Sequence, residues 1–221
     1  MVEIIRFQDV DQDALLWRCE ETLAAGGLLV MPTDTVYGLV ARADMAAAAE
    51  AVFAAKGRDA EKSLVVMVAG VEEAALLAAP QLRGPLRKLA SFWPGPLTLV
   101  VEAGDVPWRS NVAPASGSLG IRVPDSPFLL RLLARSGPLA VTSANMAGEK
   151  EPAGFAAIDP RVLAAAALAL DAEESGSGTP STVAEIKEGA VSVLRQGAIT
   201  EDELNQALMA GERGGHTAHA S

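Results

Sequence analysis

Leu28–Gly38, LLVMPTDTVYG, is the stretch around which we expect the fold to be organised. Leu28–Met31 is a run of four apolar residues, which is typical of a strand buried on both faces. Pro32 ends this strand because proline has no N–H to donate. Residues 33–35, Thr-Asp-Thr, then place short polar side chains at the strand end, where open α/β sheets often bind a ligand. The same side chains also suit a turn that caps the local backbone, so this stretch alone leaves both interpretations open.

The composition indicates a folded intracellular domain. The 221 residues are 50% hydrophobic, which is enough for one large core. The net charge of −10 argues against general affinity for nucleic acid. Cys19 is the one cysteine, so no intrachain disulfide is expected and a reducing, cytoplasmic location is the default. We expect no export signal and no membrane span, because the N-terminus is polar and apolar runs are short.

Strands and helices alternate along the chain, which predicts a single α/β domain over residues 1–210 with a twisted, mixed parallel and antiparallel sheet flanked by helices. Two adjacent strands near the C-terminus favour some antiparallel pairing. Helices are expected at 13–25, 45–55, 71–78, 84–92, 127–135, 162–167 and 200–210, and strands at 28–31, 63–69, 97–102, 120–123, 139–141, 168–170, 183–186 and 191–194.

The remaining segments are polar. Residues 104–118 read as an irregular loop, and residues 175–182, SGSGTPST, suit either a linker or a ligand-binding loop. Residues 211–221 are expected to be a disordered tail that holds both histidines, His216 and His219. Cys19 lies on an apolar helical stripe with no histidine near it in sequence, so a small core residue is predicted rather than a nucleophile.

Five cations stand at the ends of predicted elements in this acidic chain: Lys56, Arg58, Lys62, Arg122 and Arg195. Helix capping accounts for those near residue 56, and surface ion pairs are a second explanation of small energetic value. Neither explains why two arginines directly follow apolar strands. A site for a phosphate-bearing or carboxylate-bearing ligand does, because the planar guanidinium suits both anions.

Hydroxyl and amide side chains gather at the same element ends and suit the orientation of a small polar ligand; they are Thr33, Thr35, Thr142, Ser143, Asn145, Ser181 and Thr182. The chain holds no Walker A sequence, no GxGxxG after a strand and no HExxH. A Ser-His-Asp triad is not credible, because both histidines lie in the tail. An enzyme with this inventory would act by positioning and electrostatics, as in phosphoryl and nucleotidyl transfer.

Six motifs between Gly26 and Ile199 together resemble the YrdC-like family, the threonylcarbamoyl-adenylate synthases of tRNA modification. They are PTDTVYGL at 32–39, KGR at 56–58, WPGPLTLV at 93–100, GIRVPDSP at 120–127, TSANMAGE at 142–149, and STV with LRQGAI at 181–183 and 194–199. The resemblance implies a twisted α/β fold with a basic concave face. It implies condensation of L-threonine, bicarbonate or CO2, and ATP with Mg²⁺ into L-threonylcarbamoyladenylate and pyrophosphate. The product would pass to a tRNA threonylcarbamoyl-transferase complex that modifies adenosine 37.

The resemblance also implies roles for individual residues. The positions that match nucleotide contacts are Arg58, Lys62, Ser118, Ser143, Ala144, Asn145 and Arg195. Those that match threonine contacts are Thr35, Arg122, Thr142 and Ser181. Lys56 and Arg58 are the implied catalytic cations, with Lys56 directed to phosphate or carbamate. No protein ligand to a metal is implied.

Three departures from the family pattern bear on the site: Asp59 and Ser63 replace prolines, and Met67 stands where some members have a histidine. The main alternative is a YrdC-like RNA-binding module without synthase activity. Weak or no direct tRNA binding is expected, because the chain is acidic. A carbamoyl-transfer module of the hydrogenase-maturation type is a third interpretation, disfavoured because its accompanying regions are missing from this sequence.

Overall fold

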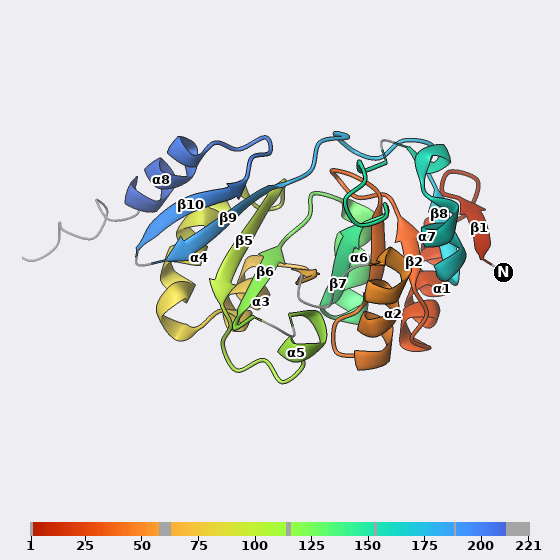
Figure 1. Cartoon of the computed structure of the whole chain (residues 1–221), viewed down its shortest axis with the longest axis horizontal. Coiled ribbons are helices and arrows are strands. Elements are labelled where there is room, and N and C mark those ends of the chain that lie inside the picture. The colour runs from red at the N-terminus through yellow and green to blue at the C-terminus, as the bar shows by residue number, and fades with distance from the viewer. Residues whose placement is uncertain (1, 58–62, 114–115, 153, 188, 211–221) are drawn as a thin grey trace, which may run out of the picture.

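The computed structural model describes residues 2–57, 63–113, 116–152, 154–187 and 189–210. A ten-stranded sheet runs through the molecule in the order β1-β8-β2-β3-β7-β4-β6-β5-β9-β10 (Figure 1). Its strands are β1 (Glu3–Arg6), β2 (Leu29–Met31), β3 (Gly38–Arg42), β4 (Val65–Met67), β5 (Leu97–Glu102), β6 (Ser118–Arg122), β7 (Leu139–Ser143), β8 (Leu168–Asp171), β9 (Thr182–Lys187) and β10 (Ala190–Arg195). The helices are α1 (Gln12–Ala24), α2 (Ala46–Lys56), α3 (Val71–Leu77), α4 (Arg83–Leu89), α5 (Arg109–Val112), α6 (Pro127–Ser136), α7 (Pro160–Ala165) and α8 (Glu201–Ala210).

The sheet is mixed, as predicted. β2 and β3 form an antiparallel pair, and β3 pairs antiparallel with β7. The short strand β4 then joins the two halves of the sheet, antiparallel to β7 on one side and parallel to β6 on the other. At the far end β5 runs parallel to β9, which pairs antiparallel with β10. The antiparallel pair predicted near the C-terminus is therefore confirmed.

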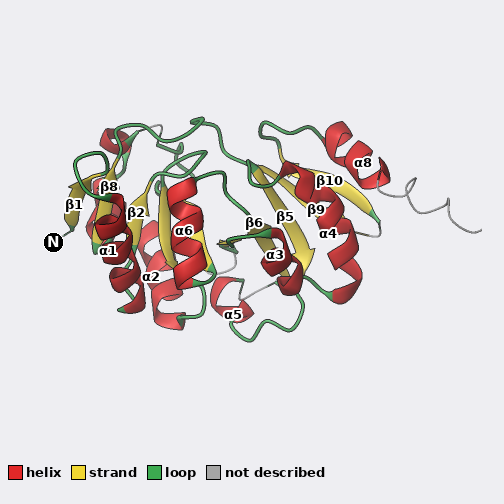
Figure 2. Ribbon diagram, turned by 180° about the vertical axis from the view of Figure 1, so that it is seen from behind, coloured by secondary structure: helices red, strands yellow, loops and turns green. Residues whose placement is uncertain are grey.

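Helices cover the sheet unevenly (Figures 1 and 2). Around β2, β3 and β7 the sheet is covered on both faces, by α1 and α6 on one side and by α2 and α7 on the other. Cys19 is fully buried in the cluster that α1 and α6 form with the sheet. The prediction of a small core residue at this position is confirmed.

Around β5, β6 and β9 the helices α3 and α4 cover one face, and the other face contributes to a pocket. β5 shows this division through its alternating side chains, which point to opposite faces of a sheet. Leu97, Leu99 and Val101 are buried in the core on the helix side. Thr98 and Val100, which lie between them, line the pocket. This half-open sheet, filled on one face by apolar side chains, leaves its other face for a ligand.

Residues 172–181, the β8–β9 connection, cross the edge of the sheet from its second strand to its ninth (Figure 1). The connection packs on the turn between β2 and β3. Gly176 N donates to Thr33 O at 3.2 Å, Ser177 N to Asp34 O at 3.1 Å, and Gly178 N to Thr35 O at 2.8 Å. This segment is therefore not a free linker, and its backbone helps to shape the strand-end region.

Local sequence signals placed most elements correctly. β5 has the predicted bounds, and Thr200 and Glu203 form the predicted capping box of α8, with Thr200 N donating to Glu203 Oε2 at 2.8 Å. Among the α-helices and strands of the described residues, three were missed: the exposed edge strand β1, β3, and the short helix α5 inside residues predicted to be irregular. The predicted tail at 211–221, with both histidines, lies outside the described residues. In the described part of the chain, no helix has the length and apolar character to cross a membrane.

Candidate active site

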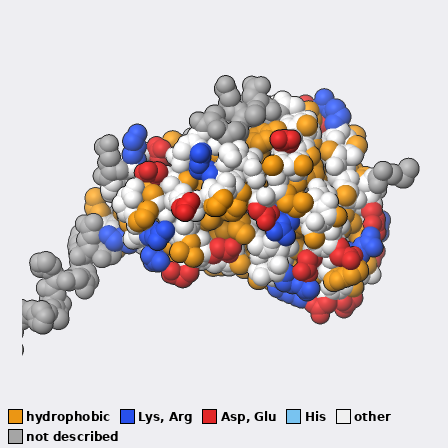
Figure 3. Space-filling model, turned by 90° about the horizontal axis from the view of Figure 1, so that it is seen from below, with side chains coloured by type: hydrophobic (Ala, Val, Ile, Leu, Met, Phe, Trp, Pro, Cys, Tyr) orange, Lys and Arg blue, Asp and Glu red, His pale blue; other side chains and the backbone are white. Residues whose placement is uncertain are grey.

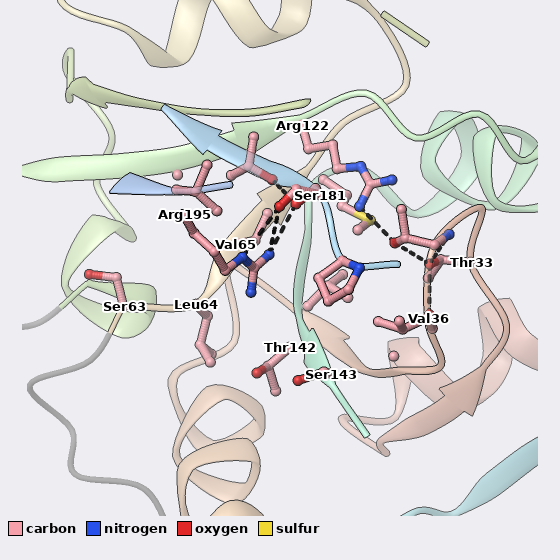
Figure 4. Close-up of a pocket in the computed structure, with 18 of the residues that line it drawn as sticks. Thr33, Val36, Ser63, Leu64, Val65, Arg122, Thr142, Ser143, Ser181 and Arg195 are labelled. Atoms are coloured by element: carbon pink, nitrogen blue, oxygen red, sulfur yellow. Dashed lines mark hydrogen bonds between the residues drawn. The ribbon is translucent and has the colours of Figure 1, made fainter. Parts of the chain in front are cut away.

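A cavity of about 340 Å³ lies where the two halves of the sheet meet (Figure 4). Its size is within the range of small-molecule sites, about 300–1,000 Å³. Strand ends and turns from across the sheet supply its walls. The lining residues are Thr33, Thr35, Val36, Tyr37, Gly38, Ser63, Leu64, Val65, Met67, Thr98, Val100, Ser116, Ser118, Gly120, Arg122, Val141, Thr142, Ser143, Glu151, Pro180, Ser181, Val183 and Arg195.

The turn between β2 and β3 is both capped and part of the pocket. Thr33 Oγ1 donates to Val36 O at 2.7 Å and accepts from Thr35 N at 3.1 Å, so its hydroxyl fixes the turn. Thr33 and Thr35 both line the cavity. The two interpretations of this stretch are therefore compatible, because one hydroxyl holds the backbone while the turn faces a ligand space.

Arg122 is the most buried cation in the pocket wall, with its side chain 3% exposed. Its Nη2 donates to Asp34 Oδ2 at 2.6 Å, its Nη1 to Thr35 Oγ1 at 3.0 Å, and its Nε to Gly95 O at 3.0 Å. Burial lowers the pKa of this guanidinium and the charge of Asp34 acts in the opposite direction. Arginine nevertheless stays protonated at neutral pH. With five N–H donors per guanidinium, two remain for a ligand after these three bonds.

Arg195 lies on the opposite side of the pocket, at the end of β10. Its Nη2 donates to Ser181 O at 3.0 Å and to Ser181 Oγ at 3.3 Å. The Ser181 hydroxyl also shares a hydrogen bond of 2.9 Å with Thr98 Oγ1. Arg195 Nη1 lies 3.9 Å from Glu151 Oε1, which brings one carboxylate into the wall. Half of the Arg195 side chain is exposed, so this guanidinium is open to a ligand from the cavity.

Lys56, Ser143 and Asn145 form a third cluster beside the cavity. Lys56 is buried, and its Nζ donates to Ser143 O at 2.5 Å and to Asn145 Oδ1 at 3.0 Å. Ser143 Oγ donates to the same Asn145 Oδ1 at 2.5 Å, and Asn145 Nδ2 donates to Glu149 O at 2.6 Å. Only Ser143 of these three lines the pocket. The ammonium therefore fixes the loop after β7 and carries its charge to the pocket edge.

The structure brings most of the predicted site residues together. Seven line the cavity: Thr35, Ser118, Arg122, Thr142, Ser143, Ser181 and Arg195. Lys56, Ala144 and Asn145 lie next to it, and the Ala144 N–H donates to Tyr37 O at 2.8 Å. Arg58 and Lys62, together with the departure at Asp59, lie outside the described residues. The basic concave face thus remains a prediction, because Arg58 and Lys62 are two of the cations expected to form it.

Sequence reasoning missed several lining residues. Thr98 had a usable signal, since it is the one hydroxyl in β5 and stands between two buried leucines. Glu151 and Ser116 lie in loops without regular structure, where the sequence gives no pattern that relates them to the pocket. Met67 lines the pocket beside Arg122, its partner in the parallel β4–β6 register, so a thioether faces the cavity at this point. No group of three or more potential metal-ligating side chains occurs in the described ranges.

The fold and pocket define an α/β protein with a cavity of small-molecule size that is lined by two arginines and a set of hydroxyls. The family model described as telomere recombination, for Sua5, YciO and YrdC proteins, matches residues 21–197. The chain belongs to this Sua5/YciO/YrdC family, as its motifs predicted.

Two curated relatives carry the same functional name. A protein of Mycobacterium tuberculosis named putative threonylcarbamoyl-AMP synthase is 33% identical over 187 residues, which cover 84% of this chain and 85% of the relative. The threonylcarbamoyl-AMP synthase of Bacillus subtilis is 30% identical over 200 residues, or 90% of this chain and 56% of the relative. The chain thus spans most of the mycobacterial protein and little more than half of the B. subtilis one.

Among solved structures, Pyrococcus abyssi Sua5 in complex with L-threonine superposes with a TM-score of 0.81 at 29% identity. The match covers 94% of this chain and 60% of that one. The single α/β domain predicted from the sequence therefore agrees with the family fold.

Proposed function

We propose that this protein is a threonylcarbamoyl-AMP synthase, which condenses L-threonine, bicarbonate or CO2, and MgATP into L-threonylcarbamoyladenylate and pyrophosphate. The threonine amine adds to CO2 and loses a proton to give a carbamate. A carbamate oxygen then forms a bond to the α-phosphorus of ATP, and the bond to the pyrophosphate leaving group breaks. The observation that carries the proposal is that predicted threonine-side and nucleotide-side residues line one cavity in a chain of this family.

The threonine end is assigned to Arg122 and the hydroxyls of Thr35, Thr142 and Ser181. The two N–H donors that Arg122 retains suit a carboxylate, because a guanidinium binds it through two parallel hydrogen bonds. The hydroxyls donate and accept, which suits the polar side chain and amine of threonine. The apolar side chains of Met67 and Val141 line the same cavity.

The nucleotide end is assigned to Arg195, Ser118 and Ser143, with Lys56 behind Ser143. The positive charges of Arg195 and Lys56 would offset the charge that develops on the phosphate oxygens in the transition state, and the two serine hydroxyls can donate hydrogen bonds to the same oxygens. Arg58 and Lys62 are proposed from the sequence to complete this end. Mg²⁺ would enter the site as part of the MgATP substrate. Glu151 is the carboxylate among the described lining residues.

The RNA-binding alternative is less favoured, because the curated relatives that match most of this chain carry the synthase name. On the face shown in Figure 3, basic and acidic side chains of the described residues are interspersed. On that face the described residues form no continuous basic stripe of the kind that nucleic-acid-binding surfaces carry. We further propose a cytoplasmic enzyme that hands its product to a tRNA threonylcarbamoyl-transferase complex and itself binds tRNA weakly.

The test is a turnover assay that follows pyrophosphate release with ATP, Mg²⁺, bicarbonate and L-threonine. Pyrophosphate should appear only when all substrates are present, and the adenylate should be detected by mass spectrometry. Omission of threonine and replacement by L-serine or L-valine are the controls. Pyrophosphate release at the full rate without threonine would refute the proposal, since ATP cleavage would not depend on carbamate formation.

A further inference from the structure

Asp34 is a buried carboxylate to which the proposed reaction gives no role. Its side chain is 9% exposed, and it is absent from the residues that line the cavity. Its Oδ2 accepts from Arg122 Nη2 at 2.6 Å, across 88 positions of sequence. Its Oδ1 is buried and has no hydrogen-bond partner in the described part of the chain. The carboxylate thus acts on the pocket through one neighbour, the Arg122 guanidinium.

Stability alone does not account for such a pair. Two charges lose hydration on burial, and an apolar pair of similar volume is often as stable or more so. A second, exposed Asp–Arg pair lies near by in sequence, between Asp44 and Arg42, at the same 2.6 Å. That pair is far less buried, because the side chain of Asp44 is 45% exposed and that of Arg42 is 29% exposed, and neither residue lines the cavity. The difference in burial points to a role for Asp34 at the site.

The geometry supports orientation as that role. Three acceptors from two segments fix the Arg122 guanidinium: Asp34 and Thr35 in the β2–β3 turn, and Gly95 in the segment before β5. Asp34 is the only charged acceptor among them, and charge-assisted bonds are about twice as strong as neutral ones. The backbone of Asp34 is itself fixed, because its carbonyl accepts from Ser177 N in the β8–β9 connection. The carboxylate therefore sits on a rigid turn and constrains the rotation of the guanidinium.

We infer that Asp34 is a positioning residue for the amino-acid end of the pocket. By binding Arg122 Nη2, it holds the guanidinium in the orientation that leaves two N–H donors for the substrate carboxylate. Asp34 itself does not touch the substrate. This inference rests on the proposed function for the identity of the ligand, L-threonine.

The experiment compares Asp34→Asn with the matched control Asp44→Asn in the full chain. The asparagine side chain keeps the shape of aspartate and loses its charge. We expect Asp34→Asn to raise the threonine KM by about tenfold or more and to change the ATP KM by less than about twofold. Asp44→Asn should change neither. A lower melting temperature of Asp34→Asn with an unchanged threonine KM would show a merely structural role and overturn the inference.

A double-mutant cycle tests the route of the effect. Arg122→Lys keeps the charge and loses the fork geometry. If Asp34 acts through Arg122, Asp34→Asn should add little to the threonine KM of Arg122→Lys, because groups that act as a unit are not additive. Full additivity would overturn the inference. Should Asp34→Asn fail to fold, Asp34→Glu retains the charge and displaces the guanidinium, and an unchanged threonine KM in that variant would also overturn it.

Calorimetric titration with L-threonine separates this inference from the proposed function. A wild-type protein that binds L-threonine but releases no pyrophosphate refutes the synthase. In that case weaker threonine binding by Asp34→Asn, and not by Asp44→Asn, still supports the positioning role. A wild-type protein that does not bind L-threonine with or without ATP and bicarbonate overturns both.

Discussion

Replacement of Gly176 by alanine should loosen the β8–β9 connection where it crosses the site. A Cβ at this position would lie 2.1 Å from the Asp34 carbonyl oxygen and 2.2 Å from its carbon, and these backbone atoms cannot rotate away as a side chain can. The connection must shift, and its three backbone hydrogen bonds to the turn at residues 33–35 would be lost or strained. At a net 0.5–1.5 kcal/mol for each bond, the free energy of unfolding should fall by roughly 1.5–4.5 kcal/mol.

The assay for Gly176→Ala is thermal unfolding followed by steady-state kinetics. For a chain of this size, about 2–4 °C is lost per kcal/mol, so the melting temperature should fall by roughly 3–18 °C. The threonine KM should rise as well, because the displaced turn carries Asp34 and Thr35. Ser177→Ala is the matched control, since its exposed hydroxyl makes only local bonds with Thr179. An unchanged melting temperature in Gly176→Ala would refute this account of the close approach.

Other predictions concern the pocket wall and the core. Gly120→Ala should leave the melting temperature nearly unchanged, because its Cβ would lie at an ordinary 3.5 Å from Thr98 Cγ2. The added methyl group should weaken substrate binding because Gly120 lines the pocket, and unaltered KM values would contradict this. Glu151→Gln should lower the ATP KM by up to about fivefold, because it removes the partly exposed ion pair between Glu151 and Arg195. A higher ATP KM would contradict this and would show that Glu151 assists binding. Burial raises the pKa of Cys19 to about 12, so the folded protein should resist alkylation at pH 8, and rapid labelling would contradict this. Wild-type stability should decline above about pH 9, because only the unfolded thiol ionises there. Cys19→Ser should retain turnover.

Local sequence determined the type of most elements and the residue types of the site. The apolar run before Pro32 specified β2, and the alternation in residues 97–102 carried both a core face and a polar Thr98. The capping box at Thr200 fixed the start of α8. The same local rules missed β1, because a four-residue edge strand with mostly exposed side chains has no apolar pattern. They missed β3 because its apolar run follows directly on the polar turn.

Only the tertiary structure decided which strands are neighbours and therefore which side chains meet. β8 lies beside β2, and β9 beside β5, although long segments separate the members of each pair. Pairing of distant strands depends on the packing of the whole sheet, and no local pattern in one sequence encodes it. The contact of Lys56 with Asn145, the bond of Asp34 to Arg122, and the place of Glu151 in the pocket wall all follow from that order. The sequence by itself thus supplied the chemical groups of the site, and the fold decided their partners.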